Sequence, residues 1–224
     1  MQKEQNTVGW SSALALLRNI RLFAGLPEEQ LNQLARMAVN RKVTKGTTIV
    51  YVGDHTDSLF IIVSGSARVI NRDEEGREVI LAMLAAGECF GEMGLIDGSP
   101  RSADVVTSEA CELLVIGKND FKAALSDNVD LCLNIMKSLV LRLRDANRKI
   151  ESLALMDVYG RVAKLLLDLS EKKDGVRVIV RKVTKQDMAK MVGASREMVS
   201  RVMRDLEASG YIRVEQGRTV LTED

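Results

Sequence analysis

The spacing of hydrophobic positions changes along the chain, and each change predicts a different kind of element. Near the N-terminus, apolar residues recur every three or four positions, which predicts helices over residues 12–22 and 27–39. Between residues 42 and 118, short β-branched runs alternate with glycines, and nine of the sixteen glycines fall there. Strand-forming runs separated by turn glycines indicate an antiparallel barrel or sandwich. The predicted strands are 48–52, 59–63, 67–71, 78–83, 103–107 and 112–116, with a hairpin loop at 73–76.

Helical spacing returns where the glycines stop, between residues 118 and 159. A short helix is predicted over residues 120–126, followed by a long one over 129–158. At about 1.5 Å per residue the long helix spans about 45 Å, which exceeds the length of a small barrel. Along it, a row of mostly apolar residues steps alternately by four and three positions, as in a coiled-coil heptad. The positions are Met136, Val140, Leu143, Asn147, Ile150, Ala154 and Asp157.

This spacing predicts a homodimer. We name its expected contact row the dimer seam, which consists of Met136, Val140, Leu143, Asn147, Ile150 and Ala154. A single amphipathic helix packed on its own domain would show the same spacing, although its length argues against that alternative. Asn147 is polar within an apolar row. Such a residue lowers stability unless it fixes the register of the two helices or contacts another group.

The C-terminal part has the pattern of a winged helix. A helix over 160–171 and a strand over 176–180 precede a helix–turn–helix over 184–212. Thr184 is placed to cap the first helix, Gly193 to break it, and Ser195 to cap the second. The apolar face predicted for the second helix consists of Met198, Val199, Val202, Met203 and Leu206. Residues 211–215 and 217–221 then form a hairpin, the wing.

A helix–turn–helix with a wing indicates sequence-specific binding of double-stranded DNA, because the second helix fits the major groove. Arg pairs with guanine and Glu accepts from cytosine, so Arg196 and Glu197 are candidates for base contacts. The expected DNA-binding residues are Lys185, Ser195, Arg196, Glu197, Ser200, Arg201 and Arg218. Arg181, Lys182 and Arg204 extend this basic set. The alternative is a solvated face, since residues 181–224 carry nine basic and seven acidic residues, a balance of +2.

Composition excludes several classes of protein. Apolar residues make up 46% and charged residues 28%, and the net charge is +1, so nothing indicates a disordered tail or a protein that coats nucleic acid. No apolar run approaches about 18 residues, and the N-terminus lacks a secretory signal, so we expect a cytoplasmic protein without a membrane partner. Three separate cysteines and a single His55 predict no metal, no haem and no iron–sulfur cluster. The sequence contains no nucleophile–base pair that would indicate an enzyme, so we expect none.

One further motif combines FGEMGL at 90–95 with PRSA at 100–103. Gly91 allows a ligand to approach the backbone, and Glu92 is suited to accept from a ribose 2′-hydroxyl. Arg101 is suited to hold a phosphodiester oxygen, with Ser102 as an additional donor. We expect this arginine to be open to solvent, so that its replacement by alanine leaves the fold intact. The alternative is that Arg101 and Glu92 form a structural ion pair.

Three motifs resemble the cyclic AMP receptor protein/FNR (Crp/Fnr) family: residues 90–103, LALMDVYGRV at 153–162, and SRE at 195–197 with Arg201. The resemblance covers nearly the whole length from residue 23. It implies an α+β protein with an N-terminal antiparallel jelly-roll β-barrel that binds cyclic nucleotide, a long dimerisation helix, and a C-terminal winged helix–turn–helix. The corresponding ranges are 12–128, 129–158 and 159–224.

The resemblance also implies that residues 90–103 are a phosphate-binding cassette. Its expected ligand residues are Gly91, Glu92, Met93, Arg101, Ser102, Arg142, Ala146 and Asn147. The family meets adenine with a Thr and a Ser side by side on the long helix, one from each subunit. Ala146 and Asn147 stand at these positions, so the sugar–phosphate half is retained and the base half is altered. Cyclic AMP is the first expectation, with cyclic GMP or cyclic di-GMP as rivals; Asn147 could instead fix dimer register.

The sequence therefore predicts a homodimeric, ligand-gated transcription regulator. Its ligand would favour one of two arrangements of the long helices, with a hinge near 157–160. Twofold symmetry predicts a palindromic operator with half-sites about one helical turn apart. RNA polymerase is an expected partner. The rival is a DNA-binding dimer with a relic barrel, which would bind its operator with or without nucleotide.

Overall fold

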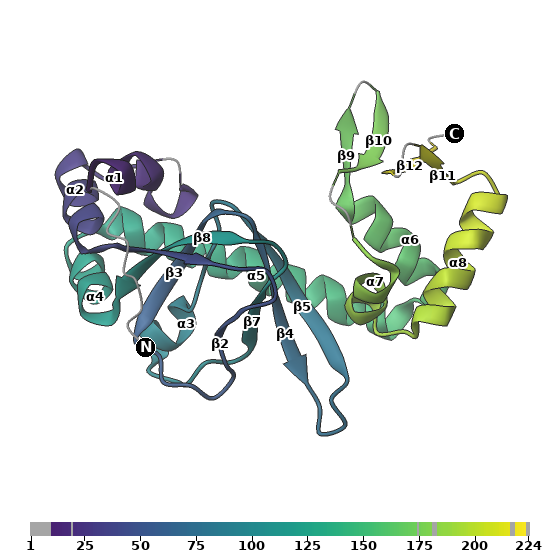
Figure 1. The fold of residues 1–224 in the computed structure, drawn as a ribbon, viewed down its shortest axis with the longest axis horizontal. Coiled ribbons are helices and arrows are strands. Elements are labelled where there is room, and N and C mark those ends of the chain that lie inside the picture. Colours follow the sequence, from purple (N-terminus) through teal and green to yellow (C-terminus); the bar gives the residue numbers. More distant parts are fainter. Residues whose placement is uncertain (1–9, 19, 174, 181–182, 216–217, 223–224) are drawn as a thin grey trace. The chain divides into compact units, whose positions relative to one another are not determined.

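The structure is a computed structural model that describes residues 10–18, 20–173, 175–180, 183–215 and 218–222 (Figure 1). The chain forms two compact units, Met1–Arg142 and Leu143–Asp224. The sequence predictions for Arg181, Lys182 and Gly217 lie outside the described residues.

The first unit contains two four-stranded sheets in which every pairing is antiparallel. The first sheet has the order β1 (Val39–Val43), β8 (Cys111–Gly117), β3 (Ser58–Ser64) and β6 (Cys89–Phe90). The second has the order β2 (Thr48–Val50), β7 (Asp104–Thr107), β4 (Ser66–Arg72) and β5 (Glu78–Ala85). Phe60 and Ile62 of the first sheet share a buried cluster with Ala67 and Val105 of the second. The sheets therefore pack face to face, which confirms the predicted β-rich domain.

Helices cover the other face of the first sheet. They are α1 (Trp10–Arg18), the 3-10 helix η1 (Arg21–Phe23), α2 (Glu28–Met37), α4 (Lys118–Ser126) and the first part of α5 (Val129–Leu155) (Figure 1). Leu59 and Ile61 of β3 pack in one cluster with Phe121 of α4 and Leu131 of α5. Because successive side chains of a strand point to opposite faces, β3 is buried on both sides. This explains its continuous run of apolar residues.

Short elements of the first unit were absent from the sequence prediction. Helix α2 ends at Met37, and Val39 begins β1, whereas the apolar spacing predicted a helix through residue 39. All five residues of β1 pair with β8, whose residues lie 68 to 76 positions further along the chain. The two-residue β6 and the helix α3 (Glu92–Asp97) are too short for any periodicity to indicate them. Long-range pairing therefore overrode local preference.

The second unit contains the last part of α5 and a helical core with a small sheet. Its elements are α6 (Val158–Leu169), β9 (Ser170–Lys173), β10 (Val176–Ile179), α7 (Lys185–Val192), α8 (Arg196–Ala208), β11 (Ile212–Glu215) and β12 (Arg218–Leu221). The strands have the antiparallel order β11-β12-β10-β9. Val162 and Leu166 of α6 pack with Met188 of α7 and Val199 of α8. These four apolar residues belong to the core of the three helices.

The predicted helix–turn–helix is confirmed in detail. The Thr184 hydroxyl accepts from the backbone nitrogen of Asp187 at 3.0 Å, which caps α7. Gly193 follows α7 with φ +64°, a left-handed conformation that favours glycine. The Ser195 hydroxyl accepts from the nitrogen of Met198 at 3.1 Å and caps α8. One expectation is wrong: Met198 is 45% exposed rather than buried with the apolar face of α8.

The long helix ends earlier than predicted. Helix α5 stops at Leu155, and the carboxylate of Asp157 accepts from the nitrogen of Gly160 at 2.8 Å, so Asp157 caps α6. Asp157 therefore does not continue the heptad row. Residues 170–171, predicted as the end of a helix, belong instead to β9, which pairs with β10 along its full length. The cap at Asp157 therefore sets the boundary between α5 and α6, and the pairing of β9 with β10 sets the end of α6.

Candidate functional site

Arg101 is a buried guanidinium held by backbone carbonyls. It lies just before β7 and is 6% exposed. Its Nη1 donates to the Gly91 carbonyl at 3.0 Å and its Nη2 to the Ser58 carbonyl at 2.8 Å. Burial lowers the pKa of Arg101, and the carboxylate of Asp57, 3.6 Å from Nη2, opposes that shift. The Arg101 Nε is buried and has no hydrogen-bond partner among the described residues.

The burial of Arg101 corrects the expectation that it is open to solvent. Removing this side chain would leave the Ser58 and Gly91 carbonyls without their donors, which costs stability. The guanidinium also lies over the Phe60 ring, 5.6 Å from its centroid. An alanine variant would therefore change packing as well as charge.

Glu92 begins α3 and is 3% exposed. Its Oε1 accepts from Nη1 of Arg142 at 2.6 Å, and Arg142 also donates to the Cys89 carbonyl. Within the described part of the chain, the buried Oε2 of Glu92 has no hydrogen-bond partner. Burying an unsatisfied carboxylate oxygen is costly, so a group that donates to it would be bound favourably. The alternative Arg101–Glu92 ion pair is absent from the described ion pairs, in which these residues pair with Asp57 and Arg142.

Gly91 joins these two groups. It has φ +88°, and a Cβ at this position would lie 2.2 Å from Nη1 of Arg101. The glycine is therefore required by the arginine itself, in addition to any ligand. Met93 is 49% exposed and Ser102 is also at the surface. The Cys89 thiol beside this cluster stays protonated, because burial, together with the Glu92 charge, raises its pKa to about 12.

The dimer seam residues are exposed in the single chain. Met136 is 53% exposed, Leu143 61% and Ile150 64%, and Val140, Asn147 and Ala154 are exposed too. The α5 residues that pack on the first unit are different ones, Leu131 and Ile135. The contacts of α5 with its own domain therefore do not account for the heptad row. Ala146, another expected ligand residue, is also exposed on α5.

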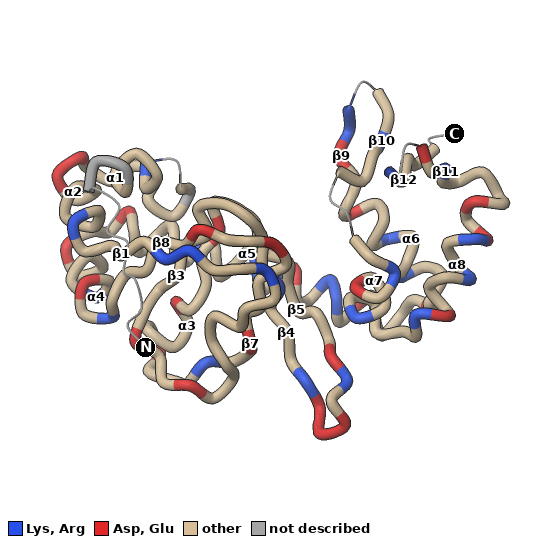
Figure 2. Tube along the Cα trace, in the orientation of Figure 1, with Lys and Arg blue, Asp and Glu red and all other residues tan. Residues whose placement is uncertain are grey.

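Five of the seven predicted DNA-binding residues lie on α8 or cap it. Arg196, Glu197 and Arg201 are exposed, Ser200 is half-buried, and Ser195 uses its hydroxyl for the cap. Lys185 at the start of α7 and Arg218 at the start of β12 are exposed as well. Figure 2 shows basic and acidic residues interspersed along α8. Arg196 and Arg201 have no ion-pair partner within the described ranges, so their guanidinium groups are available to other acceptors.

Two absences concern the described residues alone. The described residues include no helix long and apolar enough to cross a membrane. They also include no group of three or more His, Cys, Asp or Glu residues that could hold a metal ion.

Comparisons with known proteins agree with this arrangement. Residues 40–128 match the cyclic nucleotide-binding domain, and residues 160–224 match the Crp-like helix-turn-helix domain. The cAMP-activated global transcriptional regulator Vfr of Pseudomonas aeruginosa is 36% identical over 203 residues, which is 86% of this chain and 93% of Vfr. The cAMP-activated regulator CRP of Haemophilus influenzae is 35% identical over 182 residues, 78% of this chain and 80% of that protein.

Among solved structures, the c-di-GMP responsive global regulator CLP of Xanthomonas campestris superposes with a TM-score of 0.74 at 30% identity. The match covers 88% of this chain and 100% of that one. FixK2 of Bradyrhizobium japonicum has the same fold, with a TM-score of 0.74 at 18% identity over 84% of this chain and 93% of FixK2.

A cyclic nucleotide-binding domain followed by a helix–turn–helix defines a ligand-gated, DNA-binding transcription regulator. The chain belongs to the Crp/Fnr family of transcription regulators. Its effector class is therefore a cyclic nucleotide, and its family consists of regulators rather than enzymes. Regulators with the Crp-like helix–turn–helix bind DNA and act as dimers.

Proposed function

We propose that the chain is a regulator activated by cyclic AMP, which binds at the cassette of residues 90–103. The unpaired buried Oε2 of Glu92 carries the proposed site, because a ribose 2′-hydroxyl would supply the donor that this oxygen lacks. The likeness to the cAMP-activated regulators Vfr and CRP supports cyclic AMP as the effector. Arg101 would donate to the cyclic phosphate through its buried Nε and its η nitrogens. Arg142 would hold Glu92 in position and face the same anion. Gly91, Met93 and Ser102 complete the proposed pocket.

Cyclic di-GMP is the second candidate effector. The likeness to CLP, a c-di-GMP responsive regulator, favours it, whereas Vfr and CRP are named as cAMP-activated. Ala146 has no hydrogen-bonding side chain, and Asn147 both donates and accepts. If Asn147 contacts the base, it substitutes for the usual pair of hydroxyls. If it does not, its function is to fix the register of the dimer seam.

On the DNA side, Arg196 and Glu197 would contact bases, and Lys185, Arg201 and Arg218 would contact the DNA backbone. Ser195 and Ser200 would complete the interface. Two copies joined along the dimer seam would bind a palindromic operator with half-sites about one helical turn apart. RNA polymerase is the proposed further partner at promoters.

Calorimetric titration with cyclic AMP, cyclic GMP and cyclic di-GMP, at one salt concentration, tests the effector. We expect micromolar binding of cyclic AMP. Arg101→Lys keeps the charge but loses the planar fork of donors, so its Kd should rise at least about tenfold. Arg77→Ala, which removes an exposed arginine of the same unit, is the matched control and should bind normally.

Each other outcome has a definite meaning. Binding of cyclic di-GMP instead of cyclic AMP would establish the second candidate. Failure of all three to bind, with operator DNA still bound, would refute the cassette assignment and support the ligand-independent dimer. Equal affinities of Arg101→Lys and the wild type would show that the phosphate binds elsewhere.

A further inference from the structure

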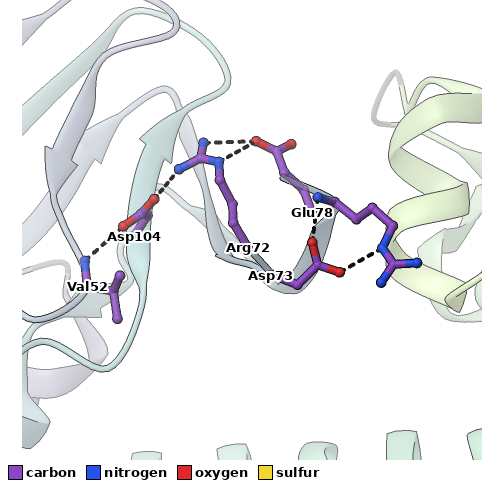
Figure 3. Close-up of polar contacts among 6 residues, drawn as sticks. Val52, Arg72, Asp73, Glu78 and Asp104 are labelled. Carbon is purple, nitrogen blue, oxygen red and sulfur yellow. Dashed lines mark hydrogen bonds and ion pairs between the residues drawn. The ribbon is translucent and has the colours of Figure 1, made fainter. Parts of the chain in front are cut away.

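Asp104 is a buried charge in a strand. It occupies the first position of β7 and is 5% exposed. One carboxylate oxygen accepts from the backbone nitrogen of Val52 at 2.8 Å, and the other accepts from Nη1 of Arg72 (Figure 3). A buried carboxylate is stable only when its charge is paired and its oxygens are hydrogen-bonded. Asp104 therefore depends on both Arg72 and the loop that contains Val52.

Arg72 connects this carboxylate to the β4–β5 hairpin. It is the last residue of β4, and it also holds Glu78, the first residue of β5, with Nε–Oε1 and Nη2–Oε1 distances of 3.0 and 2.8 Å. One guanidinium thus joins three segments: the two strand ends of the hairpin and β7. A second ion pair of the hairpin, Asp73–Arg77, lies beyond Arg72 and has no contact with Asp104 among the described bonds.

The loop held by Asp104 also fixes the backbone of Arg101. The residue after Val52, Gly53, donates its nitrogen to the Arg101 carbonyl at 2.8 Å. The Arg101 nitrogen in turn donates to the Asp54 carbonyl at 2.9 Å. At its other end the loop reaches Ser58, whose carbonyl accepts from the Arg101 side chain. These bonds tie both the backbone and the guanidinium of Arg101 to the loop of residues 51–58.

We propose that Arg72 and Asp104 are positioning residues for the nucleotide site, which act through the loop of residues 51–58. This inference rests on the proposed function, because it concerns how Arg101 is held for its ligand. Neither residue contacts the cassette side chains in the described bonds. By linkage, whatever changes the β4–β5 hairpin through Arg72 changes nucleotide affinity, and nucleotide binding changes the hairpin equally.

The test compares two substitutions in one hairpin. Arg72→Gln and Arg77→Gln each remove one positive charge, but only the first deprives Asp104 of its cation. We expect the cyclic AMP Kd of Arg72→Gln to rise about five- to tenfold, because the Val52 anchor loosens, and that of Arg77→Gln to stay within about twofold. Arg72→Lys should recover part of the loss, since it restores a cation near Asp104.

Asp104→Asn provides a test that general destabilisation would not pass. The asparagine keeps an oxygen for the Val52 nitrogen and needs no cation. The double variant Arg72→Gln/Asp104→Asn should therefore bind cyclic AMP more tightly than Arg72→Gln alone. Two independent losses of stability would instead make the double variant the weakest of the set.

Hydrogen exchange separates failure of this inference from failure of the proposed function. Without nucleotide, the Val52 and Gly53 amides should exchange faster in Arg72→Gln than in the wild type or Arg77→Gln. Unchanged exchange together with an unchanged Kd would overturn the inference, as would equal effects of the two glutamine variants. If the wild type binds no cyclic nucleotide, the proposed function fails and the positioning role falls with it.

Discussion

Gly91→Ala tests the geometry of the cassette with a matched control. Gly91 and Gly87 have nearly the same backbone conformation, with φ of +88° and +87°. Alanine in this left-handed region costs about 1–2 kcal/mol at either position. At Gly87 a Cβ meets nothing within 4 Å, whereas at Gly91 it would lie 2.2 Å from Nη1 of Arg101 and 3.1 Å from the Ser58 carbonyl. The two variants therefore share the strain and differ in the displacement of the guanidinium.

The expected magnitude follows from the bonds that are lost. A hydrogen bond to a charged group contributes about 1.5–3 kcal/mol, so a displaced Arg101 should weaken nucleotide binding about ten- to a hundredfold. Gly87→Ala should lose about as much thermal stability to backbone strain as Gly91→Ala does. It should nevertheless bind cyclic AMP with nearly the wild-type Kd. Calorimetry well below the melting temperature of either variant provides the measurement. Equal Kd values for the two variants would refute the view that Arg101 holds the phosphate.

Three further predictions concern other parts of the molecule. Asp57→Asn should tighten cyclic AMP binding a few-fold at low salt, because it removes a carboxylate that competes with the phosphate for Arg101. A higher Kd in the titration would contradict this. Leu143→Asp should shift the dimer toward monomer in light scattering, since each dimer loses two apolar side chains of about 1.5–3 kcal/mol each; an unchanged mass would exclude the seam. Arg196→Ala should cost about 1–3 kcal/mol and relax preference at one base pair in a binding assay with operator variants, whereas a uniform loss across sequences would make Arg196 a phosphate contact.

The secondary structure that the sequence predicted well depends on local signals. The caps at Thr184 and Ser195 and the turn at Gly193 act over three or four residues, so the sequence suffices to locate α7 and α8. The long helix was predicted for the same reason, since its apolar spacing extends over many turns. The end of this helix was predicted three residues too late, because the apolar spacing continues through the cap at Asp157 and does not mark the break.

The proposed nucleotide cassette was predicted from its motif, but the motif does not specify which groups pair. The sequence offered an Arg101–Glu92 ion pair as an alternative, and the fold instead pairs Glu92 with Arg142, fifty positions away. The fold likewise buries Arg101, which donates to the carbonyls of Ser58 and Gly91. These contacts form only when the β-sheets are assembled. Burial and partners are properties of the assembled domain, so no local spacing could supply them.

The sequence by itself therefore determined the order of the domains, the helix–turn–helix and the chemistry available at residues 90–103. Only the tertiary structure decided β1, β6 and β9, and the connection of Arg72 to Asp104. The physical reason is the range of the interactions. Caps and helical periodicity act between neighbours in the chain, whereas strand pairing and the burial of a charge join residues that only the folded chain brings together.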